Sequence, residues 1–121
     1  MLQVVPRLAS GGVERGTVEV AAALAAAGWR SYVASSGGKM VHEITRHGSR
    51  HITLPLASKN PLVMRGNVAR LAAVIEQYGI NLVHARSRAP AWSAWAAARR
   101  TGRHFVTTVH NAYAAGNWVK R

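Results

Sequence analysis

The stretch Pro6-Arg7-Leu8-Ala9-Ser10-Gly11-Gly12-Val13-Glu14-Arg15-Gly16 decides the fold, because the apolar pattern changes its period across it. Before the glycines, Leu2, Val4 and Val5 indicate a short buried strand. After them, one face of an alanine-rich helix is predicted to carry Val13, Thr17, Val20, Ala21 and Leu24. A strand therefore gives way to a helix across two adjacent glycines.

A glycine turn at the start of a helix is suited to binding an anion. The first helical turn has unpaired N–H groups and a partial positive charge, and residues without a Cβ let a phosphate or carboxylate reach the backbone. Gly11 and Gly12 stand at this point of the chain. A plain tight turn with Ser10 as the helix N-cap accounts for the same residues, so both interpretations stay open.

The composition describes one globular domain with a strongly basic surface. The 121 residues are 49% hydrophobic, and 16 Lys and Arg against 4 Asp and Glu give a formal net charge of +12. Such a surface fits a phosphorylated ligand, an anionic lipid headgroup or nucleic acid. No apolar run is long enough to span a bilayer, and the first residues do not form a signal peptide. We therefore expect a cytoplasmic protein.

Residue types that the chain lacks exclude several kinds of chemistry. Without Cys there are no disulfides and no thiolate metal sites. Without Asp there is no Asp-x-Asp metal loop, no EF-hand and no Ser-His-Asp triad. The Walker and Gly-x-Gly-x-x-Gly patterns are missing as well, which disfavours phosphotransferases and oxidoreductases. His84 and His110 have no carboxylate placed to orient them, so we expect no metal and no cofactor.

The rest of the chain alternates between strand and helix patterns at short spacing. Further strands are predicted at residues 29–36, 51–56, 80–84 and 104–109, and a helix precedes each of them. Ser58 or Asn60 is the expected N-cap of the long helix that starts near Pro61. Together these elements predict a doubly wound parallel α/β sheet in strand order 3-2-1-4-5 with right-handed crossovers.

Ligands of such sheets bind beyond the carboxyl ends of the strands, near the point where the strand order reverses. Loops 11–12, 84–88 and 110–111 are therefore expected to converge. His110 can hydrogen-bond a polar substrate there, or it only caps strand and loop hydrogen bonds. Arg86 and Arg88 are anion clamps if they point toward the glycine turn, and solvated loop residues if they do not.

Two tryptophans on the helix that follows the fourth strand invite a separate interpretation. Trp92 and Trp95 have helical spacing. Aromatic side chains at this spacing mostly pack in a core or between helix and sheet, and we interpret both in this way.

Four segments together carry a family resemblance: Leu8-Ala9-Ser10-Gly11-Gly12-Val13-Glu14-Arg15, Gly28-Trp29-Arg30, Leu82-Val83-His84-Ala85-Arg86-Ser87-Arg88 and Thr107-Thr108-Val109-His110-Asn111. In this order they resemble the N-terminal domain of the retaining, GT-B-fold glycosyltransferases of family four. The resemblance runs through nearly all of the chain. It implies two Rossmann-like domains facing across a cleft, with a nucleotide-sugar donor held largely by the C-terminal domain and the acceptor by the N-terminal one.

The resemblance also implies roles for individual residues. Gly11 and Gly12 would face the donor diphosphate, and the catalytic residue His110 would contact the transferred sugar. Independently of the resemblance, acceptor or anion binding is expected of Arg15, Arg86, Ser87, Arg88 and Asn111. Two departures stand out, because Asn111 replaces a glycine of many members and the C-terminal domain with its paired glutamates is absent from the chain.

We therefore expect residues 1–121 to be the incomplete, acceptor-side domain of a retaining glycosyltransferase. The chain has no Asp that could bind a metal. The departing nucleoside diphosphate would therefore be stabilised by backbone amides, a helix dipole and Arg. The basic surface suits a phosphorylated glycolipid acceptor, such as a lipopolysaccharide core, at the inner face of the membrane. The isolated domain should be inactive and should self-associate through surfaces that the missing domain covers. The alternative is a non-catalytic anion-binding module for nucleic acid or an anionic membrane surface.

Overall fold

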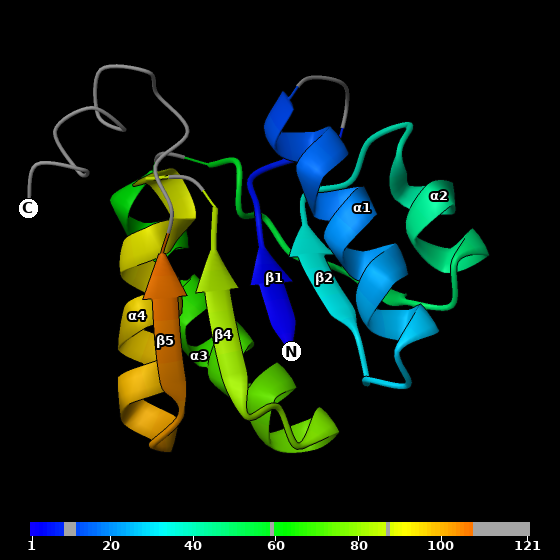
Figure 1. The fold of residues 1–121 in the computed structure, drawn as a ribbon. Helices are drawn as coiled ribbons and strands as arrows, with labels where there is room; N and C mark the ends of the chain where they lie inside the picture. The colour runs from blue at the N-terminus through cyan, green and yellow to red at the C-terminus, as the bar shows by residue number, and fades with distance from the viewer. Residues whose placement is uncertain (9–11, 59, 87, 108–121) are drawn as a thin grey trace, which may run out of the picture.

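Strands and helices alternate along the whole described part of the chain, which in this computed structural model comprises residues 1–8, 12–58, 60–86 and 88–107. The strands are short, and the longest helix follows the third strand (Figure 1). In chain order the elements are β1 (Leu2–Val4), α1 (Gly12–Ala26), β2 (Tyr32–Ser35), α2 (Val41–Arg46), β3 (Arg50–Thr53), α3 (Pro61–Tyr78), β4 (Leu82–Ala85), α4 (Arg88–Thr101) and β5 (His104–Thr107).

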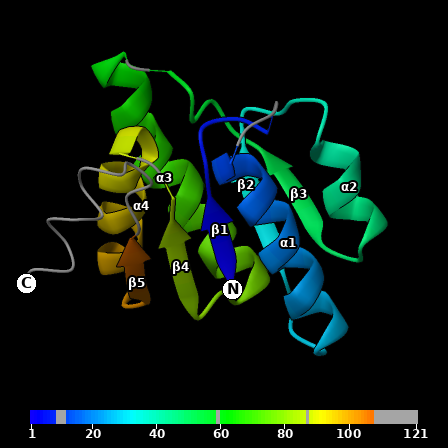
Figure 2. The same cartoon turned by 45° about the horizontal axis from the view of Figure 1, so that its top comes forward.

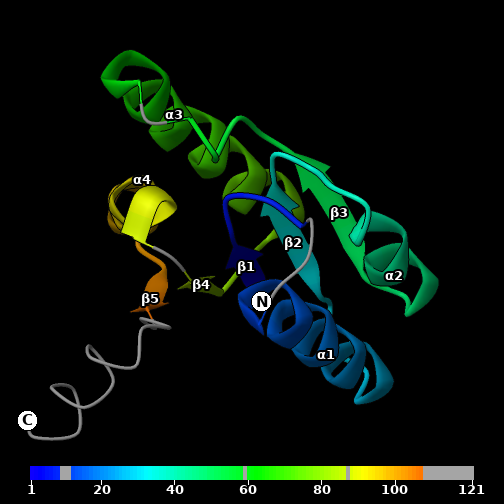
Figure 3. The ribbon, with the colours of Figure 1, turned by 90° about the horizontal axis from the view of Figure 1, so that it is seen from above.

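The five strands form one parallel sheet in the order β3-β2-β1-β4-β5, which confirms the predicted topology. β1 is the central strand, and its Val4 is in register with Ala34 of β2 and Ala85 of β4. Helices α1 and α2 cover one face of the sheet and α3 and α4 the other (Figures 2 and 3). The chain therefore forms three layers, with the first strand buried between two pairs of helices.

Each face of the sheet has its own apolar core. Between the sheet and helices α3 and α4, the fully buried residues include Leu2, Val4, Leu71, Ile75 and Val83. On the α1 and α2 side the core consists of Val5, Leu8, Val18, Ala21, Val33, Met40 and Ile44. The removal of these side chains from water is the main force that holds the helices on the sheet.

The start of helix α3 agrees with the predicted N-cap, and a glycine ends the helix. Asn60 precedes the helix with an extended backbone, and its Oδ1 accepts a hydrogen bond of 2.9 Å from the amide of Leu62. Gly79 ends the helix in the left-handed conformation, with a φ of 61° that favours glycine. Strands β2 and β3 are shorter than predicted, because Trp29 and Arg30 are exposed beyond the amino end of β2 and Pro55 cannot donate to a ladder beyond β3.

The interpretation of Trp92 and Trp95 as packed residues was wrong. Their exposed fractions are 50% and 43%, and the guanidinium of Arg99 lies 5.6 Å from the centre of the Trp95 ring. The inner face of α4 consists of the small residues Ala94, Ala97 and Ala98, all completely buried. Alanine lets the helix backbone approach the sheet closely, so both indoles lie on the outer side of α4.

Candidate functional site

The carboxyl ends of β1 and β4 form the switch point of this sheet. The two strands are neighbours, but the chain leaves β1 toward β2 and leaves β4 toward β5. Helix α1 begins at Gly12 over this edge, and α4 begins at Arg88 beside it (Figures 1 and 3). This is the edge at which open α/β sheets bind their ligands.

Arg86 is the predicted site residue that the structure places most clearly at the switch point. It follows β4 directly, and its backbone amide donates a 3.0 Å hydrogen bond to the carbonyl of Val4, which extends the pairing of β1 with β4. Only 7% of the residue is exposed. A Cβ built on Gly16 of α1 would lie 3.6 Å from its Nη1 atom. The guanidinium is therefore enclosed between the central strand and the first helix.

Gln3 holds this guanidinium in place. Arg86 Nε donates a 2.7 Å hydrogen bond to Gln3 Oε1, and Gln3 Nε2 donates a 3.2 Å bond to the carbonyl of Thr17 in α1. Gln3 and Thr17 are both completely buried. Because the carbonyl of Thr17 can only accept, the amide of Gln3 must turn its oxygen toward Arg86.

The sequence reasoning missed Gln3. The signal that could have found it is a polar residue inside a strand that the topology buries on both faces. A side chain in this position needs a hydrogen-bond partner in the interior, because an unpaired buried polar group is costly.

The Arg86 guanidinium has no carboxylate partner in the described part of the chain. All four glutamates lie in that part, and its only ion pair joins Glu76 to Arg103 at 3.5 Å. Glu14 lies in the first turn of α1, yet it forms no ion pair with Arg86 within 4.0 Å. Burial lowers the pKa of Arg86, but an arginine remains protonated at neutral pH. A full positive charge is thus held inside the protein by a neutral amide.

This arrangement is suited to binding an anion. Gln3 occupies the Nε–H, and among the described residues the structure shows no hydrogen bond from the Nη1 and Nη2 groups. These two groups can grip a phosphate or carboxylate in a bidentate manner. The start of α1 at the same edge adds the partial positive charge of a helix N-terminus.

The other predicted site residues lie away from this guanidinium or outside the described part of the chain. Arg15 lies on α1 near Gly16, but its side chain is exposed. His84 lies inside β4 and not in the loop after it. Arg88 opens α4, and its side chain is outside the described residues, as are the whole residues Gly11, Ser87, His110 and Asn111. Of the predicted residues, the structure therefore brings Gly12 and Arg86 to the same edge of the sheet.

Substitution of Gly16 tests how closely Arg86 lies against α1. A distance of 3.6 Å is ordinary van der Waals contact, so Gly16→Ala should leave Arg86 in place and raise the free energy of unfolding by about 0.5–1 kcal/mol through helix propensity. Urea denaturation measures the gain. Gly16→Leu should instead displace the guanidinium and weaken binding of inorganic pyrophosphate. Equal affinity of Gly16→Ala and Gly16→Leu for pyrophosphate would contradict the contact between Gly16 and Arg86.

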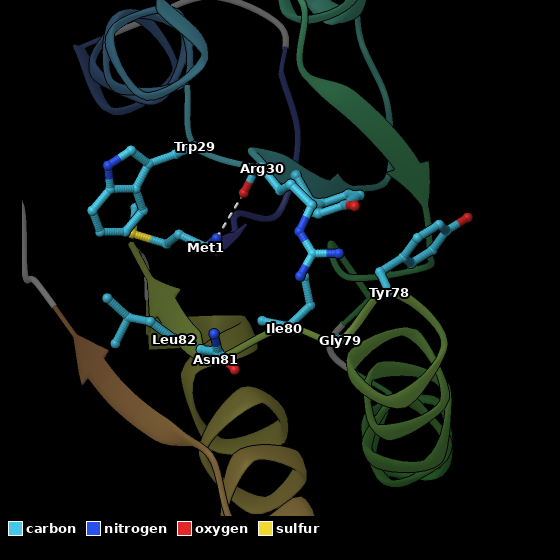
Figure 4. Close-up of a pocket in the computed structure, with 9 residues that line it drawn as sticks. Met1, Trp29, Arg30, Tyr78, Gly79, Ile80, Asn81 and Leu82 are labelled. Carbon is cyan, nitrogen blue, oxygen red and sulfur yellow. Dashed lines mark hydrogen bonds between the residues drawn. The ribbon is translucent and has the colours of Figure 1, made fainter. Parts of the chain in front are cut away.

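A small cavity lies at the opposite edge of the sheet, at the amino ends of the strands. It has a volume of about 120 Å³ and is lined by residues that include Met1, Trp29, Arg30 and Tyr78 (Figure 4). Arg30 reaches toward Gly79, and a Cβ added to that glycine would lie 3.7 Å from the Nη2 atom of Arg30. Since α3 ends here, Arg30 complements the partial negative charge of the helix C-terminus. This cavity is separate from the switch point.

His51 provides a pH-dependent contribution to stability away from the site. Its Nε2 lies 2.6 Å from Ser35 Oγ, and burial lowers its pKa. The unfolded chain then binds more protons than the native chain, so the free energy of unfolding should fall as the pH drops below about 6.5. His51→Gln should flatten this part of the pH profile in urea denaturation, whereas His42→Gln on exposed α2 should not. An unchanged profile in His51→Gln would exclude this contribution.

Two further findings concern metals and membranes. Within residues 1–8, 12–58, 60–86 and 88–107, no group of three or more His, Asp or Glu side chains is placed to hold a metal ion. None of the described helices combines the length and hydropathy needed to cross a bilayer.

The fold and its switch-point edge define a Rossmann-like α/β domain. Residues 10–121 match the family model of Glycosyltransferase Family 4, and the chain belongs to this family. A glycosyltransferase from Rickettsia africae ESF-5, known from a crystal structure, has 46% sequence identity to this chain. The two structures match with a TM-score of 0.78, and the match covers 88% of this chain. The chain spans only 28% of that protein.

More distant likeness supports the fold alone. The C-terminal domain of a hydrogenase from Pyrococcus furiosus matches with a TM-score of 0.64 at 14% identity, and 88% of each chain is covered. No curated protein matches the sequence. The predicted family and fold are therefore both confirmed.

Proposed function

We propose that the chain is the N-terminal, acceptor-side domain of a glycosyltransferase that moves a sugar from a nucleotide-sugar donor to a phosphorylated glycolipid, such as a lipopolysaccharide core, with retention of configuration. Membership of family 4 and the similarity to the Rickettsia africae glycosyltransferase support the transferase class. The donor, the acceptor and the retention go beyond these findings. The donor rests on the anion site, the acceptor on the basic surface, and the retention on the family resemblance.

The observation that carries the proposal is the buried positive charge of Arg86 at the switch point. A buried guanidinium without a carboxylate is costly, and an anionic ligand offsets that cost. In a transfer from a nucleotide sugar, negative charge develops on the departing diphosphate. A positioned arginine and a helix N-terminus stabilise such charge more in the transition state than in the bound substrate.

The remaining site residues have roles in this proposal that follow the family resemblance. The backbone at Gly11 and Gly12 approaches the donor diphosphate, and His110 hydrogen-bonds the sugar as it is transferred. Arg15, Ser87, Arg88 and Asn111 contact the acceptor or its phosphates. The reaction requires no metal, because arginine and backbone amides supply the positive charge.

Turnover by the complete protein tests this function. A panel of nucleotide sugars is offered with a phosphorylated glycolipid in the presence of EDTA, and NMR of the product reports the configuration of the new bond. We expect transfer with retention for one donor and no transfer by residues 1–121 alone, since half of a cleft cannot exclude water from the donor. Inversion, a need for divalent metal, or binding of diphosphates without any transfer would each contradict part of the proposal.

The net charge of +12 supports a location at an anionic membrane surface on the cytoplasmic side. Binding to phosphatidylglycerol vesicles should increase with the anionic lipid fraction and decrease with salt, because exposed arginines are screened. Equal binding to neutral vesicles would contradict the electrostatic attraction to the membrane.

The alternative function is a non-catalytic anion-binding module. Salt-dependent retention of RNA on filters, without any transferase activity, would favour this alternative.

A further inference from the structure

We propose that Gln3 is a positioning residue whose neutral amide keeps the charge of Arg86 available to a diphosphate. This inference rests on the proposed function, because it concerns the same anion site. It adds a residue in the central strand to the loop residues that were expected to form the site. The structure gives three separate reasons for it.

The first reason is the geometry of the hydrogen bonds. Gln3 Oε1 accepts from Nε of Arg86 at 2.7 Å, which fixes the guanidinium through the N–H nearest to the side-chain stem. The Nη1 and Nη2 groups carry the other four N–H donors, and one N–H of each points outward from the end of the same planar fork. Gln3 therefore orients Arg86 without occupying the N–H groups that a phosphate needs.

The second reason is the choice of an amide in place of a carboxylate. Glutamate has the same length as Gln3 and could accept the same bond, but its charge would neutralise Arg86. The amide instead donates to the carbonyl of Thr17 at 3.2 Å, which a carboxylate cannot do. A neutral acceptor thus leaves the net charge of the site at one full positive charge.

The third reason is the rigidity of the support. Gln3 is completely buried in β1, where it is in register with Val33 of β2 and His84 of β4. Thr17 is completely buried in α1. The amide therefore links the sheet, the first helix and Arg86, and it holds the guanidinium in one position before any ligand arrives. Preorganised groups of this kind bind without the cost of ordering a long side chain.

Titration of the 121-residue chain with inorganic pyrophosphate tests the proposal, with calorimetry to measure Kd. Gln3→Glu keeps the shape but adds a negative charge beside Arg86, and should raise Kd about 10- to 100-fold. Gln3→Met removes the acceptor without adding charge, and should raise Kd less. The control Gln77→Glu makes the same change of net charge on the exposed face of α3 and should change Kd less than about twofold.

Hydrogen exchange gives a second measurement in case Gln3→Glu does not fold. The Nε–H of Arg86 should exchange slowly in the native chain and rapidly in Gln3→Met, because its acceptor has been removed. Slow exchange in a folded Gln3→Met variant, or native pyrophosphate affinity in folded Gln3→Glu, would overturn the positioning role. If Arg86→Met leaves Kd unchanged, the anion site itself fails. If Arg86→Met weakens binding but both Gln3 variants do not, only the role of Gln3 is lost.

Discussion

Substitution of Arg86 by methionine is expected to weaken binding of the donor diphosphate strongly and to change the stability of the domain little. The charge-assisted hydrogen bonds of the two Nη groups should account for a loss of about 10²- to 10³-fold in kcat/KM of the complete enzyme. Methionine replaces the apolar stem of arginine and carries no charge, so the buried site would no longer contain a guanidinium without a carboxylate partner. The removed cost of the buried charge and the loss of the donor to the buried Gln3 Oε1 oppose each other, so the free energy of unfolding should change by less than about 1 kcal/mol.

A large loss of binding with little change in stability distinguishes a functional arginine from a structural one. Urea denaturation gives the stability, and pyrophosphate titration and steady-state kinetics give the function. Arg100→Met on the exposed end of α4 is the matched control, and it should leave both quantities nearly unchanged. A loss of several kcal/mol of stability in Arg86→Met, with native affinity for pyrophosphate, would assign Arg86 to the packing of β1, β4 and α1.

The strand order was predictable because chain direction and burial leave few choices. Strands that alternate with helices must be parallel, right-handed crossovers fix the path, and the most apolar strand belongs in the centre. The caps at Asn60 and Gly79 were predictable from local chemistry. The ends of the strands were not, because Trp29 and Arg30 continue an alternating pattern although they lie past the amino end of β2.

The orientation of the two tryptophans on α4 was decided by packing and not by spacing. Trp92 and Trp95 share a helical face with Arg99, whereas Ala94, Ala97 and Ala98 occupy the opposite face. Either face could be turned inward on the pattern of hydrophobic residues alone. Helix α4 packs close to β4 and β5, and only its alanine face is small enough to fit there. The distance between helix and sheet is a property of the tertiary structure, so the sequence pattern does not indicate it.

The candidate site was also predictable only in part. Arg86 could be placed at the switch point from its position just after a predicted strand. The hydrogen bond that orients it joins residues 83 positions apart in the chain, and no local pattern indicates such a pair. A buried glutamine in a central strand is an exception to the apolar rule, and exceptions of this kind are where function is to be sought.

His110→Ala in the complete enzyme is the second variant for which we expect a large effect. In the proposed reaction this histidine donates an oriented hydrogen bond to the sugar as it leaves the diphosphate. If that bond strengthens in the transition state, its loss should lower kcat by about 10²- to 10³-fold, as for removal of one oxyanion-hole donor, with little change in KM. Steady-state kinetics at saturating acceptor measure both constants.

His110→Gln and Arg86→Met complete the test of His110. Glutamine retains an N–H donor, so His110→Gln should recover part of kcat if hydrogen bonding is the role, and none of it if proton transfer is the role. Arg86→Met should raise the Kd for pyrophosphate, whereas His110→Ala should leave this Kd unchanged, because pyrophosphate contains no sugar. Native kcat and kcat/KM in a folded His110→Ala enzyme would leave Arg86 and the glycine turn as the functional residues of this domain. In the proposal these groups act on the charge of the diphosphate, whereas His110 acts on the sugar.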